Sequence, residues 1–201
     1  MNTKDIIKQR ALKLFNKRGV LNITLRDVAE KLEKSYGNIT YHYPTKEHVI
    51  EELYFDMVKE LKAIGAQMMK GDNLFDNILS APGHTFDLSM KYIFFFKDFV
   101  EIKRNYPEIA KKIDKSNAER KKSLKQALVM LQGQKILNAL DDDGLDYLME
   151  LSGAMRTFFF LNLSKDEFKE EDLKDKYIAY TNKLLIPYLT VWGKLLYEKY
   201  N

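Results

Sequence analysis

Residues 24–46, TLRDVAEKLEKSYGNITYHYPTK, constrain the fold most because they encode two short helices separated by a tight break. Thr24 and Asp27 have the spacing of a helix N-cap pair, and apolar residues follow at helical intervals. Ser35 can cap the second helix, which has to end just before Pro44. The pattern predicts a helix-turn-helix, in which the second helix enters the DNA major groove.

The second of these helices carries a polar surface that suits a negatively charged partner. Ile39 and Tyr43 are four residues apart and can both face a core. The other faces carry hydrogen-bonding side chains, none of them acidic: Tyr36, Asn38, Thr40, Tyr41 and His42. A helix that serves solubility alone more often mixes Glu with Lys. We therefore expect this helix to contact a polar, negatively charged surface.

A helix before residue 24 is expected to complete a three-helix unit. Thr3 can cap it, Gly19 can stop it, and Lys17 and Arg18 suit its last turn. Its apolar stripe comprises Ile6, Ile7, Ala11, Leu14 and Phe15. The pattern alone also fits a generic three-helix bundle with a polar surface.

The distribution of charge favours the nucleic-acid interpretation. Residues 1–46 contain ten Lys or Arg and four Asp or Glu, whereas residues 47–201 contain 23 and 25. The basic excess of the chain thus lies in the segment expected to read DNA. Neutralisation of phosphates releases counterions, which supplies most non-specific affinity for DNA.

Over its first 55 residues or so the sequence resembles the tetracycline-repressor (TetR) family of bacterial one-component regulators. The resemblance covers the first helix, the run T-L-R-D-V-A and the segment S-Y-G-N-I-T-Y-H-Y-P-T-K. The positions that match the family pattern in that segment are Ser35, Gly37, Ile39, Tyr43 and Lys46. Three positions depart from it: Glu33 replaces the usual turn Gly, Lys34 a small apolar residue, and Thr40 a Tyr.

This resemblance implies DNA contacts for a set of residues in the head: Thr24, Arg26, Ser35, Tyr36, Gly37, Asn38, Thr40, Tyr41, His42 and Lys46. Thr24 and Arg26 would contact phosphate, and Asn38 is a plausible reader of adenine. Lys46 would hold the DNA backbone from the start of the next helix. Structural alternatives stay open: Arg26 could pair only with Glu30, and Lys46 could be a solvated charge.

The remaining sequence predicts an all-α chain with a DNA-binding domain over 1–46 and a helical regulatory and dimerisation domain over 47–201. The expected helices span 46–70, 85–103, 107–131, 145–163 and 173–200. Breaks are expected at 71–73 and at Ala81-Pro82-Gly83, and Pro187 is expected to interrupt the last helix.

Composition excludes several classes of protein. The chain has no Cys, which excludes disulfides and thiolate metal ligands. The polar start lacks signal-peptide character, and the most apolar stretch, 92–96, is too short to span a bilayer, so we expect a cytoplasmic protein. The histidines at 42, 48 and 84 lack metal-ligand spacing, and Asp141, Asp142 and Asp143 fit a solvated helix start. We expect no enzymatic activity, metal or cofactor.

Aromatic and Met side chains in the C-terminal part have two interpretations. They could fill a core, or they could line a cavity for an apolar or amphipathic effector, as members of the resembled family sense ligands in this region. The candidate cavity residues are Phe86, Met90, Phe94, Phe95, Met155 and Phe159.

The last two expected helices are apolar on more than one face, which favours a homodimer that binds a palindromic operator. The candidate interface residues are Met149, Phe158, Leu184, Leu185, Tyr188, Trp192 and Leu195. The alternative for these residues is a monomer with a buried terminal helix.

The sequence as a whole predicts a ligand-responsive DNA-binding regulator. The alternative is a helical adaptor that has lost operator binding. A weaker alternative is an enzyme whose active site lies in the aromatic region.

Overall fold

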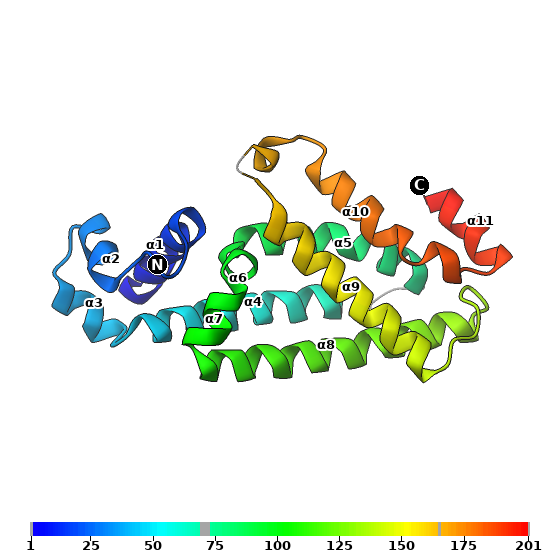
Figure 1. Ribbon diagram of the computed structural model, residues 1–201, viewed down its shortest axis with the longest axis horizontal. Helices are drawn as coiled ribbons and strands as arrows, with labels where there is room; N and C mark the ends of the chain where they lie inside the picture. Colours follow the sequence, from blue (N-terminus) through cyan, green and yellow to red (C-terminus); the bar gives the residue numbers. More distant parts are fainter. Residues whose placement is uncertain (1, 69–72, 165, 201) are drawn as a thin grey trace. The chain divides into compact units, whose positions relative to one another are not determined.

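The computed structural model describes residues 2–68, 73–164 and 166–200, and this part of the chain is helical (Figure 1). It contains no β-strand, and one isolated bridge pairs Leu137 with Leu189. The predicted all-α fold class is confirmed. No helix in these ranges is long and apolar enough to cross a membrane.

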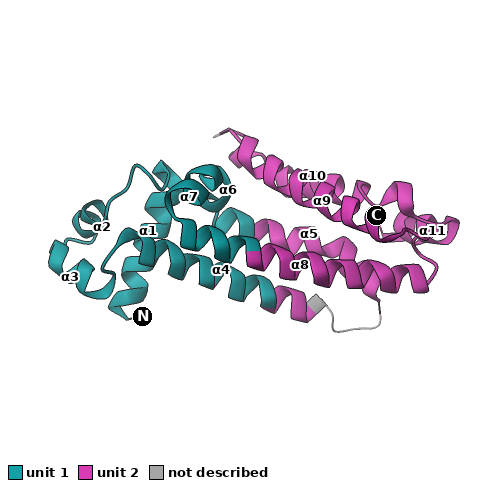
Figure 2. Ribbon diagram, turned by 60° about the horizontal axis from the view of Figure 1, so that its bottom comes forward, with its two compact units in different colours: residues 1–62, 88–114 teal, residues 63–87, 115–201 magenta. Residues whose placement is uncertain are grey.

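Two compact units are formed by segments that alternate along the sequence (Figure 2). Unit 1 comprises residues 1–62 and 88–114, and unit 2 comprises 63–87 and 115–201. These units are defined by packing rather than by role, so the functional division at residue 46 stays a prediction.

The first part of unit 1 is a three-helix head made of α1 (Thr3–Arg18), α2 (Leu25–Lys31) and α3 (Tyr36–His42). Its apolar stripes meet in a core that includes Ile7, Phe15, Val28, Ile39 and Tyr43. The expected cap of the first helix is off by one residue: Asn2 accepts a hydrogen bond from the Asp5 amide, and Thr3 is already helical.

The remainder of unit 1 comes from α4 (Lys46–Met68), the end of α5 (Leu74–Lys91), α6 (Phe94–Lys97), α7 (Phe99–Asn105) and the start of α8 (Pro107–Gly133). The predicted single helix over 85–103 is wrong, because the chain turns after Lys91 into two short helices. Hydrogen bonds to the head stabilise both breaks. Asn16 of α1 donates to the Lys91 carbonyl over 2.9 Å and accepts from the Phe94 amide, and Asp98, between α6 and α7, accepts a 2.6 Å hydrogen bond from the Val20 amide.

Unit 2 contains most of α5 and α8, followed by α9 (Asp142–Asn162), η1 (Glu167–Lys169), α10 (Leu173–Lys183), η2 (Ile186–Tyr188) and α11 (Val191–Tyr200). Asp141 caps α9 by accepting from the Gly144 amide, which confirms the solvated helix start. Pro187 lies in η2 between α10 and α11, as expected. The expected end of the helix begun at residue 46, and most of the break after it, lie outside the described residues.

The predicted loop at Ala81-Pro82-Gly83 is wrong, because α5 continues through Pro82. Pro82 and Gly83 are both buried. The backbone at Gly83 passes close to α10, where a Cβ would lie 3.3 Å from the Ile178 side chain. Packing in unit 2 therefore outweighs the poor helix propensity of this pair.

The C-terminal helix α11 is fixed to the connection after α8 by its backbone. The Thr190 amide donates to the Ile136 carbonyl over 3.0 Å, and the Thr190 hydroxyl donates to the Lys135 carbonyl over 2.7 Å. A Cβ on Gly193 would overlap the Ile136 carbonyl oxygen, so this close approach requires Gly.

Candidate functional site

The turn between α2 and α3 has a defined geometry despite its unusual residues. The Lys34 amide donates to the Ala29 carbonyl over 3.0 Å, and the Glu33 amide donates to the Glu30 carbonyl over 3.1 Å. These two bonds form a Schellman motif, whose C′ residue is left-handed. Glu33 occupies that position with φ 53°, where Gly is the least strained residue.

The caps of both helices confirm the predicted boundaries. Thr24 and Asp27 form a reciprocal capping box, and these hydrogen bonds lower the pKa of Asp27. The Ser35 hydroxyl accepts from the Asn38 amide over 3.2 Å at the start of α3. The Thr24 and Ser35 hydroxyls thus hold helix ends, while both residues remain exposed.

Helix α3 buries Ile39, leaves Thr40 and His42 half-buried, and exposes its other side chains. Tyr36, Asn38 and Tyr41 are exposed, with Tyr41 at 84%. A Cβ on Gly37 would meet no atom within 4 Å, so open space surrounds this backbone. The Thr40 hydroxyl donates back into its own helix, to the Tyr36 carbonyl over 3.2 Å.

Two contacts orient aromatic side chains on the exposed surface of the head. The Arg26 guanidinium lies 5.3 Å from the centroid of the Tyr36 ring, a cation–π geometry that joins α2 to α3. The Tyr41 and His42 rings meet edge to face at 5.1 Å. Arg26 is thereby held against Tyr36, and Tyr41 against His42, on the exposed surface of the basic head.

Lys46 has a structural partner that the sequence did not reveal. Its ammonium donates to the Val20 carbonyl over 2.9 Å and so ties the start of α4 to the connection between α1 and α2. Burial lowers the pKa of Lys46. An ammonium has three donors, so this bond leaves donors for a second acceptor.

The six candidate cavity residues are divided between the two units. In unit 1, Phe94 packs on Phe15 with ring centroids 5.3 Å apart, and Phe95 packs on Tyr54 at 5.6 Å. In unit 2, Phe86 and Phe159 pack on the buried Tyr177 ring at 5.6 and 5.0 Å. Met90 and Met155 are half-buried. These ring contacts favour core filling over a cavity lining for the four Phe residues.

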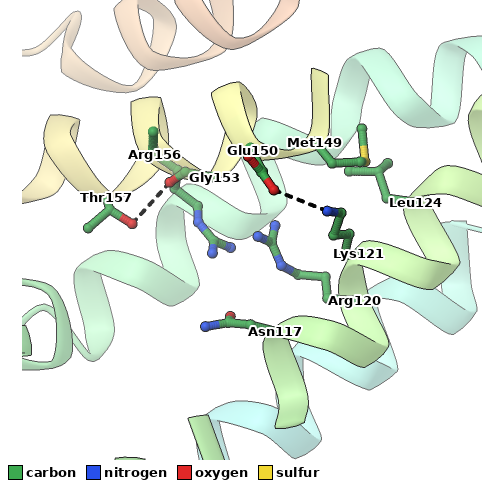
Figure 3. Close-up of a pocket in the computed structure, with 10 residues that line it drawn as sticks. Asn117, Arg120, Lys121, Leu124, Met149, Glu150, Gly153, Arg156 and Thr157 are labelled. Carbon is green, nitrogen blue, oxygen red and sulfur yellow. Dashed lines mark hydrogen bonds and ion pairs between the residues drawn. The ribbon is translucent and has the colours of Figure 1, made fainter. Parts of the chain in front are cut away.

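A cavity of about 250 Å³ lies elsewhere in unit 2, between α8 and α9 (Figure 3). None of the six candidate cavity residues lines it, and its polar residues were not among the candidates for a ligand site. The lining residues are Asn117, Arg120, Lys121, Leu124, Met149, Glu150, Gly153, Ala154, Arg156 and Thr157. Two arginines contribute to this lining, one from each helix.

The guanidinium groups of Arg120 and Arg156 point into the same space in Figure 3. Burial and the adjacent Arg156 lower the pKa of Arg120 to about 9, and burial also lowers that of Arg156. The Arg120 Nε atom is buried and has no hydrogen-bond partner among the described residues. Among the described lining residues the one carboxylate, Glu150, pairs with Lys121 at 3.3 Å.

The candidate interface residues differ widely in exposure. Met149 and Leu185 are buried in the hydrophobic core of unit 2, which Leu184 and Tyr188 also contact. Phe158, Trp192 and Leu195 are instead 68%, 55% and 54% exposed. Of the seven candidates, only these last three have more than half of their surface exposed.

The described residues contain no group of three or more His, Cys, Asp or Glu side chains placed to hold a metal ion.

These features define a helix-turn-helix transcriptional regulator, and the comparisons with known families agree. Residues 7–53 match the family described as bacterial regulatory proteins, tetR family, and residues 56–195 match the family described as TetR, bacterial transcriptional repressor. The chain belongs to the TetR family, which confirms the resemblance drawn from the head. No curated protein matches the chain.

Solved structures share the fold. A TetR-family transcriptional regulator from Marinobacter aquaeolei VT8 is 23% identical over 100% of both chains, with a TM-score of 0.86. The fatty acid degradation regulator FadR from Bacillus halodurans is 15% identical over 92% of this chain and 96% of its own, with a TM-score of 0.74. A putative regulator from Saccharomonospora viridis in complex with choline is 17% identical over 90% and 93%, also at 0.74.

Proposed function

We propose that this protein is a sequence-specific DNA-binding repressor whose operator affinity is set by a small-molecule effector. The observation that carries the proposal is the exposed face of α3, where Asn38 and Tyr41 stand free of the core on a basic head. The Asn38 amide can form a bidentate pair with adenine, and Tyr41 can contact phosphate or a thymine methyl.

Positioning of α3 depends on contacts across the head. The turn at Glu33 sets the angle between α2 and α3, and Arg26 bridges the two helices through Tyr36. Lys46 holds the start of α4 to the carbonyl of Val20. A small change at the start of α4 would therefore alter how the head meets the groove.

Coupling to an effector is expected through the helices that continue from one unit into the other. Helices α4, α5 and α8 each contain residues of both units. An effector that binds better to a conformation unsuited to DNA must weaken operator binding by that same preference, and DNA must weaken effector binding equally.

A homodimer supplies the second half-site. One head reads few base pairs, and useful specificity requires two half-sites in register with the helical repeat. The exposed Phe158, Trp192 and Leu195 side chains support a self-association surface on α9 and α11.

Selection of bound duplexes from a random pool tests this function. We expect enrichment of a short, roughly palindromic sequence, with affinity that falls steeply as salt rises. A pool that stays random would contradict operator binding and favour the adaptor alternative, in which the head is kept without a DNA target.

A further inference from the structure

We propose that the cavity between α8 and α9 binds an organic anion, whose carboxylate or phosphate group is held between Arg120 and Arg156. The inference rests on the proposed effector function and names the chemical class of the effector. It narrows the expected apolar or amphipathic effector to an amphipathic one that has an anionic head.

The charge of the cavity lining is the first argument. Arg120, Lys121 and Arg156 contribute three positive charges and Glu150 one negative charge, which Lys121 neutralises at 3.3 Å. The charge of Arg156 lowers the pKa of Arg120, so the two guanidinium groups repel each other across the cavity. An anion between them would remove this repulsion.

The second argument is the hydrogen-bonding geometry. The guanidinium is a planar fork that matches the two oxygens of a carboxylate or phosphate. Arg120 reaches the cavity from α8 and Arg156 from α9, and both point into it (Figure 3). The buried Arg120 Nε has no hydrogen-bond partner among the described residues, and buried donors of this kind usually have one.

The remaining lining accounts for specificity. Asn117 and Thr157 add polar groups beside the arginines, although the Thr157 hydroxyl already donates to the Gly153 carbonyl over 3.0 Å. Leu124 and Met149 offer an apolar wall. A volume of about 250 Å³ suits a short aliphatic or aromatic body attached to one acidic group.

Calorimetric titration of the full chain without DNA tests the proposal with four probes of one body: octanoate, octyl phosphate, octanamide and octylammonium. We expect at least one of the two anions to bind about tenfold or more tightly than octanamide, and octylammonium not to bind. The anion that binds better identifies carboxylate or phosphate as the preferred head.

Variants of Arg120 sharpen the test. Arg120→Gln should weaken anion binding about tenfold or more and leave octanamide binding unchanged. The control Lys122→Gln removes a positive charge from an exposed position on the same helix and should bind the anions normally. Arg120→Met should melt at a higher temperature than the unliganded wild type, because it removes a repelled buried charge.

Three results would overturn the proposal: equal affinity for octanoate and octanamide, unchanged anion affinity in Arg120→Gln, or no binding of any of the four probes. Because no DNA is present, the outcome is separate from that of the operator selection. Anion binding without an operator would leave this site intact and refute the regulator. Selection of an operator without binding of any anion would support the DNA-binding regulator and refute the anion site.

Discussion

The guanidinium of Arg26 on α2 lies over the ring of Tyr36 on α3, 5.3 Å from its centroid. The contact connects the two helices of the helix-turn-helix on their exposed side, on the surface that we propose faces the DNA groove. A cation in this position can contact a phosphate and at the same time orient the aromatic ring that it covers.

Loss of the Arg26 charge should weaken binding to every DNA sequence. Arg26→Ala is expected to lower affinity for specific and random duplexes alike and to reduce the salt slope by about one. Fluorescence anisotropy at several salt concentrations measures both quantities. Lys17→Ala removes one charge from an exposed site on α1 and serves as the control; equal effects of the two variants would refute a specific contact by Arg26.

The left-handed turn residue should limit the stability of the head. Glu33→Gly is expected to raise the free energy of unfolding by about 1 kcal/mol, because Gly adopts φ 53° without a Cβ clash. Glu33→Ala removes the same charge but keeps the clash, so it should give no gain. Denaturant titration compares them, and equal stabilities would contradict the strain argument.

Removal of the Tyr43 hydroxyl should make the protein more stable. The side chain is 1% exposed, and its hydroxyl has no hydrogen-bond partner among the described residues. Tyr43→Phe is expected to stabilise the protein by about 1 kcal/mol, since a buried unpaired group is removed. The matched control is Tyr92→Phe, which loses a 2.8 Å bond to Glu60 and should destabilise. A loss of stability in Tyr43→Phe would mean that its hydroxyl is satisfied.

The exposed C-terminal aromatic should be required for self-association. Trp192→Glu places a charge at a side chain that is 55% exposed, and we expect it to convert the homodimer into a monomer of 23.7 kDa. Val129→Glu, at a position 50% exposed on α8, is the control and should remain dimeric. Sedimentation of the wild type as a monomer at micromolar concentration would refute the dimer itself.

Helix caps could be predicted from the sequence because their hydrogen bonds join residues three positions apart. The Thr24 capping box and the Ser35 cap are examples, and so is the cap of α9 at Asp141. The family could also be recognised in the head, because matching positions are concentrated in α2 and in the segment from Ser35 to Lys46, although the turn residues Glu33 and Lys34 depart from the pattern.

Features that depend on distant residues could not be predicted. Lys46 looks like a free cation until the fold brings Val20 to it, and Pro82 looks like a helix break until α10 packs beside Gly83. Arg120 and Arg156 lie on different helices, so no spacing in the sequence marks them as a pair. The aromatic residues drew attention instead, although many of them fill cores.

Sequence discrimination by α3 is the central claim, and the affinity ratio between the selected operator and a scrambled duplex tests it most directly. The wild type should prefer the operator by about a thousandfold or more. Asn38→Ala should lower the ratio by about tenfold or more while the affinity for scrambled DNA stays nearly unchanged, since a base contact carries sequence information and a phosphate contact does not. A wild-type ratio near one, or an Asn38→Ala ratio equal to that of the wild type, would contradict sequence reading by this helix.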